Sequence, residues 1–453
     1  HGRGGRARLK VLTIFLVATA LSASTPAWDT HARLLADGHS LVVEGRFAPG
    51  DADVFMVDSA DAPFVSEVET ETAGKWNAVA EAGGRWPVVE AETRGAHLRW
   101  RFDLAAASKA RRSGVRPFGS GFIFRPRVWL LRPESFMPGR AARLVVETPP
   151  GLGFISGLDP SGQITVDDLD EGPEAALGPF RLQRLVVKGG TLAAIAPDGD
   201  LPLTPAQETR WFKTAASALE DAYGRLPLPW TAVFLLPVGQ GDGVLFGSTR
   251  GGGGAAITVL LGRSVSDQDI ADDWILTHEL IHTAMPDLDR SHHWFEEGIP
   301  TYLEPLLRLR EGRETPEGFW SDLRQQLPKG QPQGGDRGLD RTPTWGRTYW
   351  GGALFCFVAD CRIREATHGR QSLLDALRAI LPAGGIATHG DLRASLALGD
   401  KALERPVLLP LYDAWAQSPE TVDLEAIWKR LGVGREPFDN QAPGAALRKA
   451  WGR

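Results

Sequence analysis

Two histidines and a glutamate in the segment THELIHTAM, residues 277–285, have the types and the spacing of a metal site. His278 and His282 are four residues apart, so on a helix both imidazoles lie on one face and can bind one metal ion. Glu279 follows the first histidine and lies beside the open position of that metal. The pattern predicts one zinc ion per chain with Glu279 as general base. The alternative, a helix with two solvated histidines, is disfavoured because the residues around the motif are apolar.

Two imidazoles do not complete a catalytic zinc shell, so a third ligand must be found. A third histidine six residues after His282, which one class of zinc protease uses, is excluded because Leu288 stands there. Two aspartates fall in the turn after the motif helix, where we expect them to point to solvent or to cap. Adjacent glutamates on a helix differ by about 100°, so only one of the two that follow can face the metal. The candidates within fifteen residues are Asp287, Asp289, His292, His293, Glu296 and Glu297.

The elements that position the motif can be predicted from caps and periodicity. Ser266 and Asp269 form a capping box at the start of residues 264–286, which we expect to be one helix that Pro286 ends. Upstream, residues 204–224 predict a long amphipathic helix, and two apolar strands follow it. The glycine-rich segment GQGDGVLFGSTRGGGG between those strands lacks the Gly-Lys-Ser/Thr ending of a phosphate-binding loop, and we interpret it as a flexible connection.

The length of 453 residues exceeds what one ordinary core supports and predicts several domains. From about residue 40 to 195, short runs such as SLVVEGRF and HLRWRFDL alternate with period two and predict antiparallel β-structure. From about residue 315 onward the pattern is helical. We therefore expect an α+β multidomain chain with a signal peptide at 1–27, an antiparallel β-sheet domain at 28–195, a zinc catalytic domain at 196–330 and a C-terminal helical domain at 331–453.

The N-terminal 27 residues predict a secretory signal peptide. A basic stretch precedes an apolar run of about thirteen residues, Val11–Ala23, and small residues follow. The run is shorter than the ~18 residues of a membrane span, so we expect cleavage near Ala27, no stable span afterwards and a periplasmic or secreted protein. An uncleaved anchor is the alternative. Removing the four cations of the first ten residues takes the formal net charge from -6 to -10, which disfavours nucleic acid as a partner.

The only two cysteines, Cys356 and Cys361, are five residues apart in a predicted helix. Five residues turn a helix by about 500°, which points the two thiols in different directions and would strain a disulfide. We expect both to be buried small hydrophobic residues.

Two segments resemble a family of zinc peptidases. WFEEGIPTYLE, residues 294–304, resembles the W-[LF]-x-E-G-[FILA]-x-x-Y-x-E segment of gluzincin aminopeptidases, in which the glutamate before glycine binds zinc. Residues 348–381, TYWGGALFCFVADCRIREATHGRQSLLDALRAIL, resemble a segment of the glycyl aminopeptidase family; in related gluzincins a tyrosine there hydrogen-bonds the tetrahedral oxyanion. The resemblance covers about 200 to 395 and implies a thermolysin-like mixed catalytic domain. It also implies Glu297 as the third zinc ligand and Tyr349 as the oxyanion donor.

The chain departs from the family at the loop that holds the free α-amine of a substrate. The acidic residue of that loop has no clear counterpart in GVLFGSTRGGGG, and Gly351 replaces the family's lysine. The resemblance implies aminopeptidase-like action, and this departure leaves endopeptidase action open as the alternative. Glu304, seven residues after Glu297, shares its helical face and is predicted to accept the outer N–H of a zinc histidine; a solvated carboxylate is the alternative.

These patterns predict an exported zinc-dependent metallopeptidase whose substrate is a peptide or protein. Zinc with two neutral imidazoles and one carboxylate keeps a net positive charge, which lowers the pKa of bound water towards ~7. Glu279 would take the proton of that water and pass it to the leaving amine. The alternatives are a catalytically inactive relative that binds peptides or envelope partners, and a non-peptidase hydrolase on the same scaffold.

Overall fold

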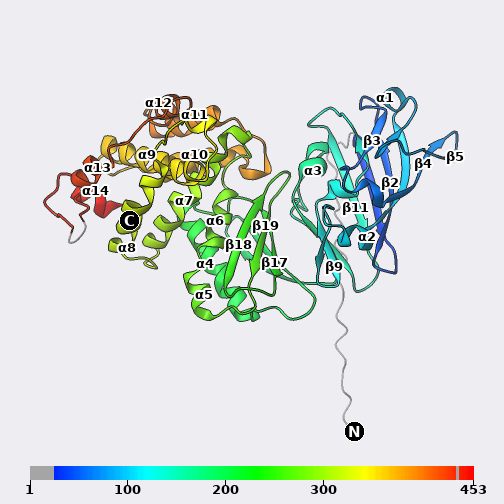
Figure 1. Cartoon of the computed structure of the whole chain (residues 1–453), viewed down its shortest axis with the longest axis horizontal. Coiled ribbons are helices and arrows are strands. Elements are labelled where there is room, and N and C mark those ends of the chain that lie inside the picture. Colours follow the sequence, from blue (N-terminus) through cyan, green and yellow to red (C-terminus); the bar gives the residue numbers. More distant parts are fainter. Residues whose placement is uncertain (1–24, 435–437, 453) are drawn as a thin grey trace, which may run out of the picture. The chain divides into compact units, whose positions relative to one another are not determined.

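The computed structural model describes residues 25–434 and 438–452, which form two compact units (Figure 1). The first unit takes the described residues within His1–Gln183, Ala194–Leu201 and Gly252–Ala256, and the second takes those within Arg184–Ala193, Pro202–Gly251 and Ile257–Arg453. The apolar run on which the signal-peptide prediction rests lies outside the described residues. Among the residues that are described, no helix has the length and apolarity needed to cross a membrane.

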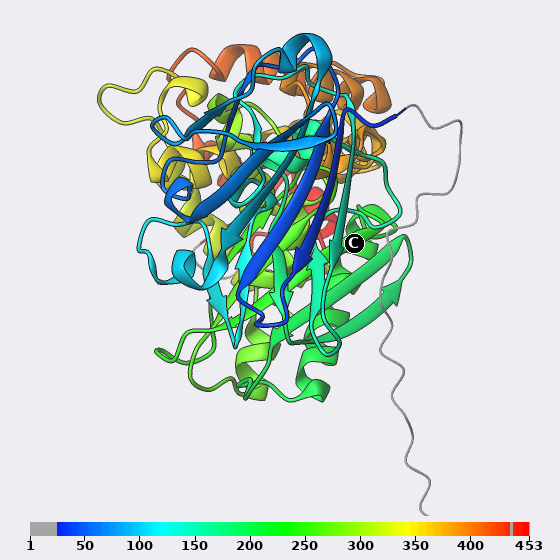
Figure 2. The ribbon, with the colours of Figure 1, turned by 90° about the vertical axis from the view of Figure 1, so that its right-hand side faces the viewer.

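The first unit is built from three sheets. The largest has seven strands in the order β13-β11-β1-β2-β7-β4-β5, and its long strands lie side by side (Figure 2). The others have the orders β10-β3-β6 and β12-β14-β9-β8. The strands of the three sheets are β1 (Trp28–Leu34), β2 (Ser40–Phe47), β3 (Val54–Met56), β4 (Val65–Thr72), β5 (Lys75–Ala78), β6 (Arg85–Pro87), β7 (Ala96–Asp103), β8 (Arg116–Phe118), β9 (Gly121–Phe124), β10 (Arg132–Pro133), β11 (Ala141–Glu147), β12 (Gly153–Ser156), β13 (Ile164–Thr165) and β14 (Ala175–Gly178).

Alternating burial along the strands of the first unit gives it one hydrophobic core. In β2 and β7 every second side chain is buried, as the period-two pattern predicts, and Trp28 and Trp100 are enclosed among the sheets. Each indole finds a partner, since Trp28 donates to Asp51 and Trp100 to the carbonyl of Trp129. Three short helices complete the unit: α1 (Ala91–Arg94), α2 (Leu104–Lys109) and α3 (Val166–Glu171).

The predicted α+β architecture is confirmed, with one exception in the first unit. Strand β1 pairs antiparallel with β2 but parallel with β11, so the largest sheet is mixed. The parallel pair joins segments more than a hundred residues apart, and local periodicity carries no information about such a pairing.

A five-stranded sheet in the order β15-β16-β17-β19-β18 supports the candidate site. Its strands are β15 (Phe180–Val187), β16 (Gly190–Pro197), β17 (Trp230–Pro237), β18 (Val244–Arg250) and β19 (Ala256–Leu261). The helix α4 (Pro205–Tyr223) starts at the predicted cap, where the Thr204 side chain accepts from Gln207, and ends at Gly224 in the left-handed region. The interpretation of the glycine-rich segment as a flexible connection is wrong for 244–250, which form the edge strand β18.

The motif segment forms two helices where the sequence predicts one. Helix α5 (Asp267–Asp272) starts at the predicted Ser266 capping box, and helix α6 (Ile275–His282) starts after a break. Asp273 causes the break: its backbone is extended, and its carboxylate accepts the backbone N–H groups of Ile275 and Leu276 at 3.1 Å each. The indole of Trp211 donates to the same carboxylate at 2.7 Å. The first turn of the motif helix is thereby fixed.

The rest of the second unit is helical, as predicted. The helices are α7 (His293–Arg310), α8 (Pro316–Gln326), α9 (Gly352–Thr367), α10 (Leu373–Ile380), α11 (Leu392–Leu403), α12 (Leu408–Trp415), α13 (Leu424–Leu431) and α14 (Ala445–Ala450), with a π-helical turn η6 (Gly346–Gly351) before α9. Cys356 and Cys361 are buried free thiols on α9, which confirms the expectation for both.

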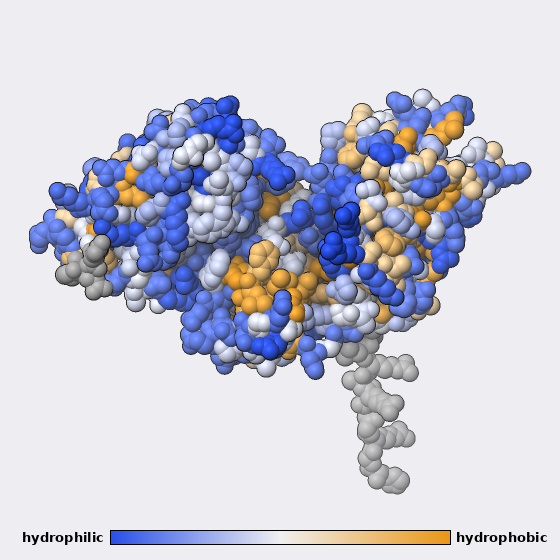
Figure 3. Space-filling model, in the orientation of Figure 1, coloured by the Kyte–Doolittle hydropathy of each residue, from blue (hydrophilic) through white to orange (hydrophobic). Residues whose placement is uncertain are grey.

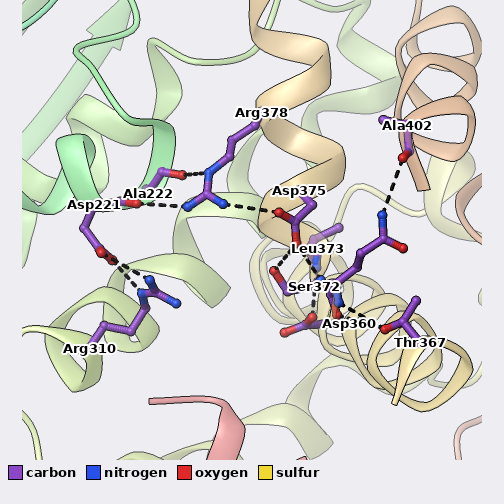
Figure 4. Close-up of polar contacts among 11 residues, drawn as sticks. Asp221, Ala222, Arg310, Asp360, Thr367, Ser372, Leu373, Asp375, Arg378 and Ala402 are labelled. Carbon is purple, nitrogen blue, oxygen red and sulfur yellow. Dashed lines mark hydrogen bonds and ion pairs between the residues drawn. The ribbon is translucent and has the colours of Figure 1, made fainter. Parts of the chain in front are cut away.

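Polar contacts tie these helices to α4. Arg378 on α10 donates to the backbone carbonyls of Asp221 and Ala222 at the end of α4, and Arg310 on α7 pairs with the Asp221 carboxylate (Figure 4). Cations at a helix C-terminus satisfy its unpaired carbonyls and interact favourably with the helix dipole. Asp360 on α9 accepts from the backbone of Leu373, which fixes the start of α10 (Figure 4). The scaffold around α6 and α7 is therefore held at several points.

Candidate metal centre

Helix α6 carries the motif and lies between α7 and the edge strand β18. Its backbone makes His278 and His282 neighbours on one face, with ring centroids 5.1 Å apart. His278 and Glu279 are buried, each with 7 % of its surface exposed. Both imidazoles point towards α7, where Glu297 lies opposite them.

Glu297 and Glu296 leave the first turn of α7 in different directions. The Glu297 carboxylate oxygen Oε2 lies 3.5 Å from Nε2 of His278 and 3.7 Å from Nε2 of His282. Glu296 instead accepts the backbone N–H of Leu288 at 2.9 Å. Of the two glutamates, Glu297 is the one that faces both histidines.

The three ligand atoms fit a zinc ion. They lie within 4.8 Å of one another, and among the described residues they form the one group of three such atoms from histidine, cysteine or acidic side chains. Zinc binds nitrogen and carboxylate oxygen at about 2.0–2.2 Å, so a tetrahedral ion needs donor atoms roughly 3.4 Å apart. The separations of 3.5 and 3.7 Å match this requirement.

The protonation states of the group also suit a metal. Burial lowers the pKa of His282 to about 4, against the opposing charge of Glu297, so this imidazole is neutral with a free lone pair. Burial alone would raise the pKa of Glu297, but its hydrogen bond with His278 and its electrostatic interactions with the neighbouring histidines bring it below the usual value. A neutral imidazole and an ionised carboxylate are the forms that bind zinc.

Strand β18 holds Glu279 from the other side of α6. The Thr249 hydroxyl lies 2.7 Å from Glu279 Oε2 and 2.9 Å from its backbone carbonyl. Gly247 leaves room for the glutamate, since a Cβ there would lie 2.5 Å from Glu279 Cγ. Burial raises the pKa of Glu279 to about 7, although the charge of His278 and the hydrogen bond with Thr249 oppose this. Neither Gly247 nor Thr249 was predicted from the sequence. The pattern that could have indicated a close contact at Gly247 is the small residue between larger ones in VLFGSTR.

Tyr349 lies on the π-helical turn η6, which packs against α7. Burial and the charges of Glu297 and Glu279 raise the pKa of Tyr349. Tyr349 thus interacts electrostatically with both carboxylates of the candidate centre, and its phenol stays protonated and can donate a hydrogen bond. Within the described part of the chain, the Tyr349 hydroxyl makes no hydrogen bond.

Two glycines set the approach of η6 and α9 to α7. A Cβ at Gly298 would lie 2.3 Å from the carbonyl carbon of Gly352, and a Cβ at Gly352 would lie 2.0 Å from the carbonyl oxygen of Trp294. Helices α7 and α9 therefore meet backbone to backbone at Gly298 and Gly352. Gly298 directly follows Glu297, and Gly352 is three residues after Tyr349.

Glu304 is a buried residue of α7. Its carboxylate pairs with Arg308 at 2.8 Å. Burial raises the pKa of Glu304 to about 7, against the charges of Arg308, Arg313 and His278. The predicted hydrogen bond from a zinc histidine to Glu304 is not among the contacts of the described residues, whereas the ion pair with Arg308 is.

The remaining candidates of the sequence do not belong to the group of three ligand atoms. Asp287 pairs with His389 at 2.9 Å, and Asp289 is exposed. His292 lies beside Tyr412, 3.2 Å from its hydroxyl. His293 faces the outer oxygen of Glu297 at 3.6 Å.

Comparisons with known proteins agree with this architecture. No protein-family model matches the sequence, and no curated protein matches it. Among solved structures, an aminopeptidase N family protein from Idiomarina loihiensis matches with a TM-score of 0.59 at 12 % identity, over 91 % of this chain and 77 % of that one. A two-domain M1 zinc metallopeptidase variant with bound L-tryptophan matches with a TM-score of 0.53 at 16 % identity, over 88 % and 95 %.

An M1 zinc metallopeptidase from Deinococcus radiodurans matches with a TM-score of 0.53 at 16 % identity, over 87 % of this chain and 95 % of that one. The fold of this chain is similar to that of the M1 zinc metallopeptidases. The predicted gluzincin aminopeptidase-like architecture is thereby confirmed. At these identities the similarity concerns the fold, and the chemistry must be argued from the site.

Proposed function

We propose that this chain is a zinc-dependent metallopeptidase that hydrolyses peptide bonds. The observation that carries the proposal is the convergence of His278, His282 and Glu297, from two packed helices, on one point. Glu279, a buried carboxylate with a pKa of about 7, adjoins that point. One zinc ion per chain fits the three ligand atoms. When bound, such an ion supplies a Lewis acid that acidifies water and polarises a carbonyl group.

Glu279 acts as the general base in this proposal. It accepts a proton from the attacking water and then donates it to the leaving amine. In the metal-free chain burial raises the pKa of Glu279 to about 7, and the charge of a bound cation would lower it, which favours the carboxylate form that accepts the proton. The hydrogen bond with Thr249 fixes one carboxylate oxygen and leaves the other for the reacting water.

Tyr349 donates a hydrogen bond to the oxyanion that forms on the substrate carbonyl. This interaction is strongest in the transition state and therefore acts on turnover more than on binding. The raised pKa of Tyr349 keeps the phenol protonated for this role. Glu304 pairs with Arg308 and interacts with His278 only through its charge, so we propose no direct contact of Glu304 with the ligand group.

The proposal includes aminopeptidase-like action, with endopeptidase action as a second candidate. Strand β18, which adjoins Glu279, carries no carboxylate between Val244 and Arg250. A free α-ammonium beside the centre would find no acidic partner on this strand, which favours the second candidate. An inactive peptide-binding relative is disfavoured, because the chain keeps the proposed base and all three proposed ligands. Export through the signal at 1–27 and the domain boundaries at 195 and 330 are parts of the proposal that rest on the sequence.

Zinc content and peptide cleavage test the proposal together. The chain is purified, its zinc is measured by mass spectrometry, and it is incubated with a mixed peptide library in which each peptide is present with a free and with an acetylated N-terminus. We expect one zinc per chain and cleavage that a chelator abolishes and added zinc restores. Release of single residues from free N-termini alone supports aminopeptidase action, and equal cleavage of acetylated peptides supports endopeptidase action. A chain that holds zinc and cleaves no peptide contradicts the proposal.

A further inference from the structure

Large hydrophobic side chains that stay exposed are concentrated around the candidate centre. Among the described residues eight such side chains are exposed, and four of them lie in the segments that build the site: Leu245, Phe246, Trp274 and Trp345. Contact of this much apolar surface with water is unfavourable, and clusters of it mark places where a ligand binds.

Leu245 lies on the face of β18 that is directed to the motif helix. Side chains alternate along a strand, so Leu245 shares its face with Gly247 and Thr249, whereas Phe246 is on the opposite face. A Cβ at Gly247 would lie 2.7 Å from the side chain of Ile275, and one at Gly243 would lie 3.3 Å from Asp269. Leu245, between these two contacts, therefore lies alongside the start of α6.

The same part of the surface is hydrophobic in the space-filling view. Figure 3 shows hydrophobic side chains gathered over strands β17 and β18. Leu245 is 39 % exposed and Phe246 is 57 % exposed on β18. Because β18 is the last strand of its sheet, no further strand covers its outer edge.

Trp274 brings a second apolar surface to the centre. It precedes the first residue of α6, is 49 % exposed, and packs edge-on against the His278 ring with centroids 5.6 Å apart. One part of the indole thus touches a proposed zinc ligand while the rest faces solvent.

Trp345 brings a third surface from the other segment of the site. It precedes η6, is 63 % exposed, and its ring lies 6.0 Å from that of Tyr349. The sequence before it is rich in glycine and proline, yet it is firmly held. Asp336 pairs with Arg347 at 2.8 Å, both nearly fully buried, and Asp340 accepts from the indole of Trp294 at 2.8 Å. Trp345 is therefore presented by a fixed backbone, which lowers the entropy lost when it binds a ligand.

We propose that the centre selects peptides with large apolar side chains, aromatic ones above all, next to the cleaved bond, and that Leu245, Trp274 and Trp345 make this selection. The inference rests on the proposed peptidase function. Trp274 contacts a proposed ligand and Trp345 contacts the proposed oxyanion donor, while Leu245 shares its strand face with Gly247, which lies against the proposed base. A substrate held by these groups meets all three side chains. Two of them are rigid aromatic groups, which bind apolar side chains with little loss of conformational freedom.

The test is the ratio of kcat/KM for two matched sets of fluorogenic peptides, in which the residues flanking the cleaved bond are either Phe, Trp and Leu or Ser and Ala. Wild type should prefer the large apolar set by about tenfold or more, since burying one such side chain contributes ~1.5–3 kcal/mol. Trp345→Ala should reduce this ratio by about tenfold, and Leu245→Ser should reduce it by a smaller factor. Leu398→Ala, an exposed residue of α11 away from these segments, is the matched control that should keep the ratio.

The outcomes separate selection from a structural role. If Trp345→Ala lowers kcat/KM equally for both sets, the indole merely holds Tyr349 and the inference is wrong. A wild type that cleaves both sets equally also overturns it and leaves the peptidase function intact. If the wild type cleaves no peptide of any kind while holding zinc, the proposed function itself fails. Zinc content and thermal melting of each variant show that the fold is retained, and Trp345→Phe, which keeps an aromatic ring, should keep most of the ratio.

Discussion

Gly298 on α7 and Gly352 on α9 meet backbone to backbone, and this contact sets the distance between the two halves of the candidate centre. Glu297 directly precedes the first glycine, and the η6 turn with Tyr349 directly precedes the second. Any side chain at either position would lie under 3 Å from backbone atoms of the other helix. Gly298 and Gly352 are therefore both required for the same reason: the backbones of α7 and α9 leave no room for a side chain at either position.

Gly298→Ala should therefore damage stability and turnover together. The added methyl group forces α7 and α9 apart, which we expect to lower the free energy of unfolding by ~1–3 kcal/mol and to move Tyr349 away from the substrate carbonyl. Chemical denaturation and peptide cleavage measure the two effects. Gly334→Ala is the matched control, because a Cβ there meets no atom within 4 Å. Normal activity of Gly298→Ala would show that the helix contact does not position Tyr349.

Thr249→Val should slow the chemical step without removing zinc. The hydroxyl lies at hydrogen-bond distance from the Glu279 carboxylate and lowers its pKa, so its loss raises that pKa further. We expect kcat to fall by about tenfold, since a hydrogen bond to a charged group contributes ~1.5–3 kcal/mol, and the acid limb of the rate profile to move to higher pH. Thr249→Ser keeps the hydroxyl and should restore both values. A pH profile unchanged in Thr249→Val would exclude the interaction from catalysis.

Glu297→Ala and Glu296→Ala should differ in zinc binding. Only Glu297 faces both histidines, whereas Glu296 accepts the N–H of Leu288. We expect Glu297→Ala to weaken zinc binding by more than about a hundredfold, beyond the effect of losing a supporting contact. Glu296→Ala should keep one zinc per chain after dialysis, as measured by mass spectrometry. Loss of zinc in Glu296→Ala with retention in Glu297→Ala would reverse the ligand assignment.

The metal-free protein should show the raised pKa of Glu279 in its stability. A carboxyl group whose pKa rises from 4.5 to about 7 on folding stabilises the folded state below pH 4.5, and this contribution is lost as the pH rises to 7. In a chelator, the free energy of unfolding of wild type minus that of Glu279→Gln should therefore fall by ~2–3 kcal/mol from pH 5 to pH 8. Glu304 and His282 titrate in both proteins, so their contributions cancel in the difference. Parallel pH profiles of the two proteins would contradict the assignment.

Much of the site could be predicted from the sequence because its signals are local. The four-residue spacing of His278 and His282 puts them on one helical face, and the following helix offers two adjacent glutamates. Which of these faces the metal depends on how α7 packs on α6, so spacing alone left Glu296 and Glu297 open and the resemblance pointed to Glu297. The long helices and most strands followed from caps and alternation in the same local way.

The features that escaped prediction depend on contacts between distant segments. Thr249 hydrogen-bonds Glu279, which is thirty residues later in the sequence. Gly247 in β18 leaves the space that the Glu279 side chain occupies. The break before α6 follows from Asp273, an ordinary helix residue by pattern, whose carboxylate is held by Trp211 from another helix. The parallel pairing of β1 with β11 is a further case, since neither strand's composition records its partner.

The central claim is that this centre is a catalytic zinc site with Glu279 as its base. The most direct measurement compares wild type with Glu279→Gln for zinc per chain and for cleavage of a peptide with a large apolar residue beside the cleaved bond. We expect one zinc per chain in both proteins, with cleavage in wild type and a loss of at least about a hundredfold in the variant. Cleavage by Glu279→Gln at the wild-type rate with zinc bound would contradict it.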